Sequence, residues 1–226
     1  MEPGRLLASG RAADIFDQGD GTVLRRYRTD HNTESEARLV SWLHDVGFPV
    51  PAVHHADGGD IVMDHIPGPT MMEDLTERPW RVVAHIRTLA RLQRRLNSMA
   101  APPWLSSGET IPPGPALLHL DLHPMNVILS PSGPIVIDWT NARRGPAGFD
   151  AAMTYIIMVT FDADGPMQVI GQRVVVGLFR LIRGRWEIAR YLEPAGTHRL
   201  ADPNLTGAER DSLQRLLAGR RHRPAD

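Results

Sequence analysis

The segment Ile66-Pro67-Gly68-Pro69 divides this chain of 226 residues into two stretches of different character. Two prolines around one glycine neither continue a strand nor start a long helix. Short apolar runs separated by tight turns precede the segment, whereas long helical patterns follow it. We therefore expect an α+β fold of two lobes, with the boundary at residue 67.

The first 67 residues predict a small antiparallel sheet that carries one helix. A helical run begins at Thr33, where Thr33 and Glu36 have the spacing of a capping box. The turns Gly19-Asp20-Gly21 and Asp57-Gly58-Gly59 are typical of connections between paired strands. The five expected strands cover residues 5–8, 14–18, 22–27, 53–56 and 60–65.

The second lobe, residues 68–219, is expected to be mainly helical. Residues 101–115 are rich in proline and glycine and predict a loop, and residues 126–138 predict a hairpin that turns at Pro131-Ser132-Gly133. The last seven residues, 220–226, are expected to form a solvated tail. The helical patterns cover residues 80–99, 149–161, 167–183 and 206–217, the last with a capping box at Thr206 and Glu209.

The composition excludes several classes of protein. Cysteine is absent, which excludes a disulfide framework, a thiolate nucleophile and cysteine-ligated metals. The formal net charge of −1 gives no field that would attract nucleic acid or an anionic membrane. No segment has the pattern of a secretion signal or a membrane span, so a cytoplasmic location is expected. All 25 basic side chains are arginine, so any task usually given to lysine falls to arginine.

The most informative segment is His119-Leu120-Asp121-Leu122-His123-Pro124-Met125-Asn126, which Ile137-Asp138-Trp139 follows. It places two carboxylates and an amide oxygen at the ends of short strands that a hairpin joins. Hard oxygen ligands suit Mg²⁺, which takes phosphate oxygens as further ligands. Phosphoryl transfer needs an Asp that accepts the proton of the acceptor hydroxyl, an Asn five residues later and a second Asp for metal.

These residues resemble the catalytic and metal-binding signature of aminoglycoside phosphotransferases, choline kinases and related small-molecule kinases, which have a protein-kinase-like fold. The order of segments within residues 5–160 supports the resemblance. Residues 9–16 lie where that family has its nucleotide loop, and residues 62–66 lie at its lobe junction. The resemblance implies an enzyme that uses ATP and Mg²⁺ to phosphorylate a hydroxyl group of a small molecule.

The resemblance also implies a role for each matching residue. Asp121 would be the catalytic base, and Asn126 and Asp138 would hold Mg²⁺. The purine of ATP, or of GTP, would bind the main chain of Asp64 and Ile66.

Three further residues of the first lobe would belong to the nucleotide site. Gly10 in the nucleotide loop and Arg25 on the next strand would bind the phosphates, and Glu36 would be the partner of Arg25. Asp150 would be a structural aspartate of the second lobe, without a catalytic role.

The chain departs from the family pattern in three places. Arg25 stands where the family has lysine, and arginine is bulkier and binds phosphate through a fork. The nucleotide loop holds a single glycine, Gly10. Leu120 and Met125 occupy positions where the family often has glycine, so this loop must either avoid positive φ or accept strain.

Other interpretations stay open on the same residues. A nucleotide-binding pseudokinase or regulatory protein with little turnover fits Arg25 and the single loop glycine. A zinc or manganese hydrolase would use the alternating His119, Asp121 and His123, although ligands on opposite faces of an extended segment do not easily meet one ion. Glu36, finally, is explained equally well by a capping box alone.

Overall fold

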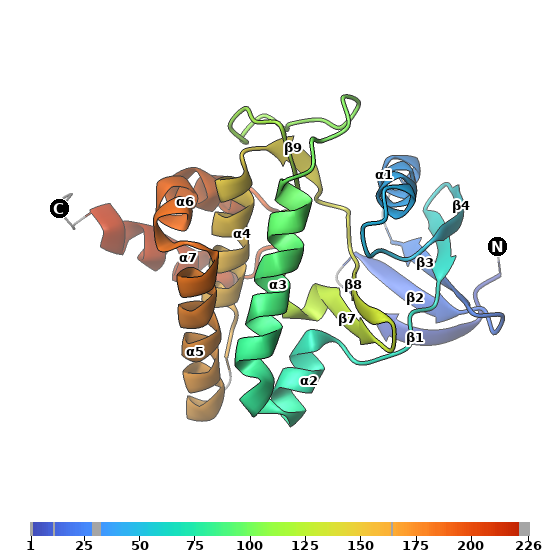
Figure 1. Cartoon of the computed structure of the whole chain (residues 1–226), viewed down its shortest axis with the longest axis horizontal. Coiled ribbons are helices and arrows are strands. Elements are labelled where there is room, and N and C mark those ends of the chain that lie inside the picture. Colours follow the sequence, from blue (N-terminus) through green and yellow to red (C-terminus); the bar gives the residue numbers. More distant parts are fainter. Residues whose placement is uncertain (1, 11, 29–32, 164, 222–226) are drawn as a thin grey trace. The chain divides into compact units, whose positions relative to one another are not determined.

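The computed structural model describes residues 2–10, 12–28, 33–163 and 165–221. The chain forms two compact units. The first comprises residues 1–71 and 125–140, and the second comprises residues 72–124 and 141–226. Strands predominate in the first unit and helices in the second, which confirms the α+β class (Figure 1).

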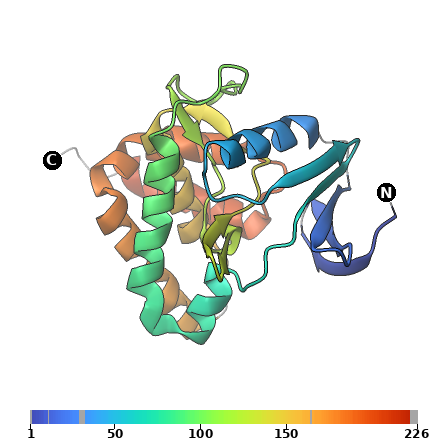
Figure 2. The ribbon, with the colours of Figure 1, turned by 45° about the vertical axis from the view of Figure 1, so that its right-hand side comes forward.

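The first unit contains a five-stranded antiparallel sheet with the strand order β1-β2-β3-β5-β4. The helix α1 (Thr33–Asp45) packs against β4 and β5 (Figure 2). All five predicted strands and the helix are confirmed. The strands are β1 (Arg5–Ser9), β2 (Ala13–Asp17), β3 (Thr22–Tyr27), β4 (Val53–Asp57) and β5 (Asp60–Asp64).

The predicted hairpin, β7 (Val127–Ser130) with β8 (Gly133–Val136), also belongs to the first unit. Two proline carbonyl groups hold it there, because Leu129 N donates to Pro69 O and Val136 N donates to Pro49 O, each at 2.8 Å. The segment Ile66-Pro67-Gly68-Pro69, which follows β5, thus lies alongside β7. The predicted functional division at residue 67, into a nucleotide-binding and a catalytic lobe, stays a prediction.

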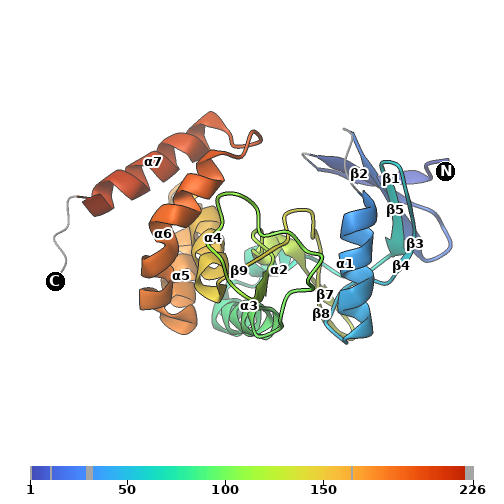
Figure 3. The ribbon, with the colours of Figure 1, turned by 90° about the horizontal axis from the view of Figure 1, so that it is seen from above.

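The second unit is built from helices around α4, most of whose residues are buried. The helices α3, α4 and α5 run side by side (Figure 1), and α6 packs on α4 and connects to α7 (Figure 3). No helix among the described residues is long and apolar enough to cross a membrane. The elements are α2 (Met71–Glu77), η1 (Pro79–Arg81), α3 (Val82–Asn97), β6 (Ala116–Leu118), η2 (Pro124–Asn126), β9 (Arg143–Gly145), α4 (Ala147–Thr160), α5 (Pro166–Arg183), α6 (Arg185–Leu200) and α7 (Gly207–Arg221).

The four predicted helices of the second lobe are present, and α2, β6, η2, β9 and α6 are additional. The capping box of α7 forms as expected, because Thr206 N donates to the Glu209 carboxylate and Glu209 N donates to Thr206 Oγ1. Of the predicted tail, residues 220 and 221 continue α7. The other tail residues, 222–226, lie outside the described part of the chain.

One buried carboxylate fastens α2 to the start of α3. Asp74 is 2% exposed and accepts hydrogen bonds from Arg78 at 2.5 Å, Arg81 at 3.0 Å and His85 Nε2 at 2.6 Å. The hydrogen bond from His85 lowers the pKa of Asp74 most, and Arg78 and Arg81 add to this effect against the opposing effect of burial. The ionised carboxylate is therefore the form that the fold stabilises.

This arrangement predicts an acid-sensitive contribution to stability. Because the pKa of Asp74 is lowered in the folded state, its contribution is present above the unfolded-state pKa of about 3.9 and is lost as the pH falls through the folded-state pKa. Asp74→Asn should therefore be less stable at neutral pH, and its free energy of unfolding should fall less below about pH 4 than that of the wild type. Urea unfolding at a series of pH values measures both, and parallel curves for the two proteins would contradict the assignment.

Candidate active site

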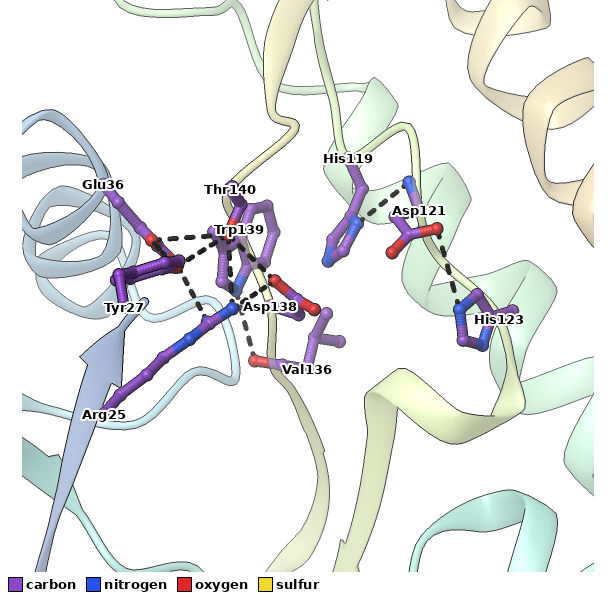
Figure 4. Close-up of polar contacts among 10 residues, drawn as sticks. All are labelled: Arg25, Tyr27, Glu36, His119, Asp121, His123, Val136, Asp138, Trp139 and Thr140. Atoms are coloured by element: carbon purple, nitrogen blue, oxygen red, sulfur yellow. Dashed lines mark hydrogen bonds and ion pairs between the residues drawn. The ribbon is translucent and has the colours of Figure 1, made fainter. Parts of the chain in front are cut away.

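Five polar side chains of the first unit form one connected cluster, which we call the Arg25 cluster. Arg25 and Tyr27 come from the same face of β3, Glu36 comes from α1, and Asp138 and Thr140 follow β8 (Figure 4). Arg25 spans the two carboxylates: its Nη1 donates to Glu36 Oε1 at 3.1 Å and its Nη2 donates to Asp138 Oδ1 at 2.7 Å. The guanidinium thereby ties the sheet, the helix and the segment after the hairpin together.

Two hydroxyl groups complete the Arg25 cluster. Tyr27 donates to Glu36 Oε2 at 2.5 Å. Thr140 Oγ1 accepts from Arg25 Nη2 at 3.2 Å and lies 3.0 Å from Asp138 Oδ1, 2.8 Å from the Tyr27 hydroxyl and 3.5 Å from Glu36 Oε2. Thr140 has a single hydroxyl proton, which it donates to Asp138 Oδ1 because this is the nearest charged acceptor. Both carboxylates of the cluster therefore have a hydroxyl partner as well as Arg25.

Burial and the neighbouring carboxylates have opposite effects on the pKa of Arg25. The side chains of Arg25 and Glu36 are 12% and 4% exposed. Burial disfavours the charged guanidinium, but the nearby carboxylates of Asp138 and Glu36 outweigh it and raise the pKa of Arg25. Burial also raises the pKa of Tyr27, with Glu36 adding to the effect against Arg25. Arg25 therefore stays charged and the Tyr27 phenol stays protonated.

The predicted partnership of Arg25 with Glu36 is confirmed as a contact. Arg26, its neighbour on β3, points to the other face and forms a two-pronged ion pair with Asp60, at 2.7 Å and 2.6 Å. Both oxygens of the Glu36 carboxylate are used by Arg25 and Tyr27, so the capping-box explanation alone does not account for Glu36.

Asn126 and Asp138, the predicted metal ligands, lie at the two ends of the β7–β8 hairpin. Ile137 N donates to Asn126 O at 3.1 Å, which brings the two ends together in the first unit. Asp138 has a φ of 66°, an uncommon backbone for a residue other than glycine, and Trp139 beside it is buried against Phe48. A carboxylate and an amide oxygen are ligands that fit Mg²⁺.

Asp121 lies in the second unit, within residues 119–124, which we call the Asp121 loop. Leu120 before it has a φ of 66°, so the loop accepts the strain that a glycine would avoid. A branched side chain in this conformation costs about 1–3 kcal/mol. The backbone is held by Asp150 on α4, whose Oδ1 accepts from Leu120 N at 2.8 Å and whose Oδ2 accepts from Asn97 Nδ2 at 2.8 Å. Asp150 thus has the structural role expected of it.

The two histidines beside Asp121 differ in their surroundings (Figure 4). His119 is fully buried, and its Nδ1 accepts from Asp121 N at 3.3 Å, as expected of a packed histidine that orients the loop. His123 Nε2 lies 3.7 Å from Asp121 Oδ1. Among the described residues, no group of three or more histidine, aspartate or glutamate side chains is arranged to hold a metal ion.

The remaining predicted nucleotide residues lie in the sheet of the first unit. Gly10 closes the β1–β2 turn, with its N donating to Ala13 O at 2.9 Å. Ser9, at the end of β1, and Arg28, directly after β3, both bind the Asp14 carboxylate, at 2.7 Å and 2.5 Å. Asp64 ends β5, and Ile66 follows two residues later. A role for these residues in binding a nucleotide stays a prediction.

Comparison with known proteins finds a family match over one segment of the chain and a shared fold over most of it. Residues 108–185, which contain the Asp121 loop, Asp138 and Asp150, match the model of the phosphotransferase enzyme family. Among curated protein sequences, none matches the chain.

Several solved structures share the fold over nearly the whole chain. A thermostable mutant of aminoglycoside phosphotransferase APH(4)-Ia, in a ternary complex with AMP-PNP and hygromycin B, is 15% identical with a TM-score of 0.68 and covers 96% of this chain and 94% of its own. A choline/ethanolamine kinase family protein from Mesorhizobium loti is 17% identical with a TM-score of 0.63, and the match covers 99% of this chain and 88% of that protein's chain. The ADP-bound aminoglycoside phosphotransferase APH(2'')-Ib is 14% identical with a TM-score of 0.61, covering 99% and 88%. At these identities the likeness concerns the fold.

Proposed function

We propose that the protein is an ATP- and Mg²⁺-dependent phosphotransferase that moves the γ-phosphoryl group to a hydroxyl of a small molecule, with GTP as the alternative donor. The observation that supports this best is the Arg25 cluster, in which one buried cation on the sheet binds both the α1 carboxylate and Asp138. Phosphoryl transfer relies on positioning and charge neutralisation, and this cluster supplies a fixed positive charge beside a carboxylate suited to a metal.

Each residue of the proposal has a definite task. Arg25 binds phosphate oxygens through its fork, and Glu36 and Tyr27 keep its side chain in place. Asp138 and Asn126 would hold Mg²⁺, which when bound neutralises charge on the phosphates. Gly10 and the main chain of Asp64 and Ile66 complete the nucleotide site in this proposal.

Asp121 carries the proton transfer. As the acceptor oxygen forms its bond to the γ-phosphorus, its O–H bond breaks and the proton passes to the Asp121 carboxylate. The bond from the γ-phosphorus to the bridging oxygen breaks at the same time, and ADP leaves. His119 and the strained backbone at Leu120 set the direction of Asp121, and strain of this kind is common at functional sites.

A nucleotide-binding protein with little turnover is the second candidate. One observation favours it: Arg25 already occupies an oxygen of Asp138, the residue proposed to bind metal. Asp121, Asn126 and Asp138 are nevertheless all present, which a protein without catalysis does not need. Slow hydrolysis of ATP in the presence of Mg²⁺ would favour the enzyme over this candidate.

Binding of nucleotide is the first test of the proposal. A ligand that binds only the folded state increases the free energy of unfolding, by about 2.7 kcal/mol at a hundredfold excess over its dissociation constant. The melting temperature rises as a result. We expect ATP or GTP with Mg²⁺ to raise the melting temperature at millimolar concentration. If neither nucleotide changes it, the proposal fails.

We further expect that the acceptor is not a polycation. Polycationic antibiotics call for an acidic binding surface, whereas residues 139–226 contain 13 arginines against 9 acidic residues. A screen of metabolites and antibiotics that carry hydroxyl groups, followed by release of ADP, should therefore find neutral or anionic acceptors. Efficient phosphorylation of kanamycin-like compounds would contradict this expectation.

A further inference from the structure

The Oδ1 atom of Asp138 accepts from two donors. Arg25 Nη2 lies 2.7 Å from it and Thr140 Oγ1 lies 3.0 Å from it. A carboxylate has about four lone-pair sites on its two oxygens, so these two donors use those of Oδ1. A divalent cation that binds through this carboxylate must take the other oxygen or displace a donor.

Arg25 does not relieve this conflict by losing its proton. Arginine does not deprotonate in proteins. The guanidinium group of Arg25 is also fixed in position, because its Nη1 donates to Glu36 Oε1. Glu36 is itself held by Tyr27, whose hydroxyl donates to the other carboxylate oxygen. A second cation at Asp138 therefore meets a fixed positive charge.

We infer that Arg25 and the metal ion compete for Asp138, so that the protein binds a divalent cation weakly until nucleotide phosphates engage Arg25. This inference rests on the proposed function, because it takes Asp138 as a metal ligand. Phosphate oxygens are anionic and match the planar fork of the guanidinium. They therefore draw Nη2 away from Asp138 and neutralise the positive charge of Arg25. Metal and nucleotide then favour each other's binding, and this coupling is reciprocal.

Titration of Mn²⁺ into the nucleotide-free protein tests the competition without any catalysis. The free Mn²⁺ is followed by its electron paramagnetic resonance signal. The double variant Arg25→Gln/Glu36→Gln removes the guanidinium charge together with the carboxylate that it would leave unpaired. We expect this variant to bind Mn²⁺ at least about tenfold more tightly than the wild type, and the gain to disappear when Asp138→Asn is added. Equal affinity, or a gain that survives Asp138→Asn, overturns the inference.

Arg25→Lys is the second variant, and it decides the question if the double variant does not fold. Lysine keeps the charge but has one nitrogen in place of the fork, so it cannot span Glu36 and Asp138 through two separate nitrogens. We expect Mn²⁺ to bind Arg25→Lys about threefold or more tightly than the wild type. An unchanged affinity in a folded Arg25→Lys protein overturns the inference.

A titration with ATP in the presence of EDTA tests the role of the phosphates. We expect metal-free ATP to bind the wild type, because Arg25 supplies a cation, and to bind the double variant at least about tenfold more weakly. Equal binding to both proteins would overturn this part of the inference. If the wild type binds ATP neither with nor without metal, the proposed function fails, and the Mn²⁺ comparison still decides the competition.

Discussion

Replacing Asp121 by Asn should reduce phosphoryl transfer by about a hundredfold to ten-thousandfold, the usual contribution of a general base, while leaving the affinity for Mg²⁺-ATP nearly unchanged. The reason is that Asp121 is proposed to act on the acceptor hydroxyl, so its loss removes stabilisation that develops mainly toward the transition state. The Asn side chain is of similar size, which keeps the loop packed.

Asp138→Asn is the matched comparison, because it makes the same chemical change at the proposed metal ligand. Here both the affinity for Mg²⁺-ATP and the turnover should fall, since an anionic ligand is lost. Calorimetric titration of Mg²⁺-ATP into both variants separates the two roles. Equal loss of binding in the two would refute the assignment, and it is also the pattern expected if Asp121 were itself a metal ligand.

The sequence is sufficient to predict the sheet and the hairpin that hold the Arg25 cluster, because their signals are local. Turn residues and alternating apolar positions marked the sheet and the β7–β8 hairpin. In contrast, α6 follows α5 after the single residue Gly184 and contains Pro194, so neither a gap nor a regular apolar stripe marked it. The seven-residue α2 is too short to show a helical period.

The candidate site was predictable only where residue spacing defines it. Tyr27 and Thr140 were missed, although each stands two residues beyond a predicted residue, Arg25 or Asp138, and Tyr27 shares the face of Arg25 on β3. The sequence does not decide whether Leu120 adopts a strained positive φ or avoids it. Its φ depends on a hydrogen bond to Asp150, 30 residues later in the chain, and a tertiary contact of this kind leaves no local signal.

That same contact makes Asp150 the residue where stability and activity should fall together. Its two carboxylate oxygens satisfy Leu120 N and Asn97 Nδ2, and Asp150 is fully buried. Asn97 in turn accepts from the buried Arg183 at 3.1 Å, so its amide cannot turn over to compensate. Asp150→Ala leaves Leu120 N–H and one N–H of the Asn97 amide without an acceptor. The other N–H of that amide keeps Leu117 O at 3.0 Å, and each lost acceptor costs about 1–3 kcal/mol.

We therefore expect Asp150→Ala to lower the free energy of unfolding by about 3 kcal/mol, with the exposed Asp162→Ala as a control that changes it by less than about 0.5 kcal/mol. Because Leu120 N would lose its acceptor, the strained backbone should relax and misdirect Asp121. Turnover of the folded variant should fall while its affinity for Mg²⁺-ATP is kept. Urea unfolding measures the first effect, and ATP hydrolysis measured well below the melting temperature measures the second. A folded Asp150→Ala protein with wild-type turnover would show that Asp150 supports the fold without positioning Asp121.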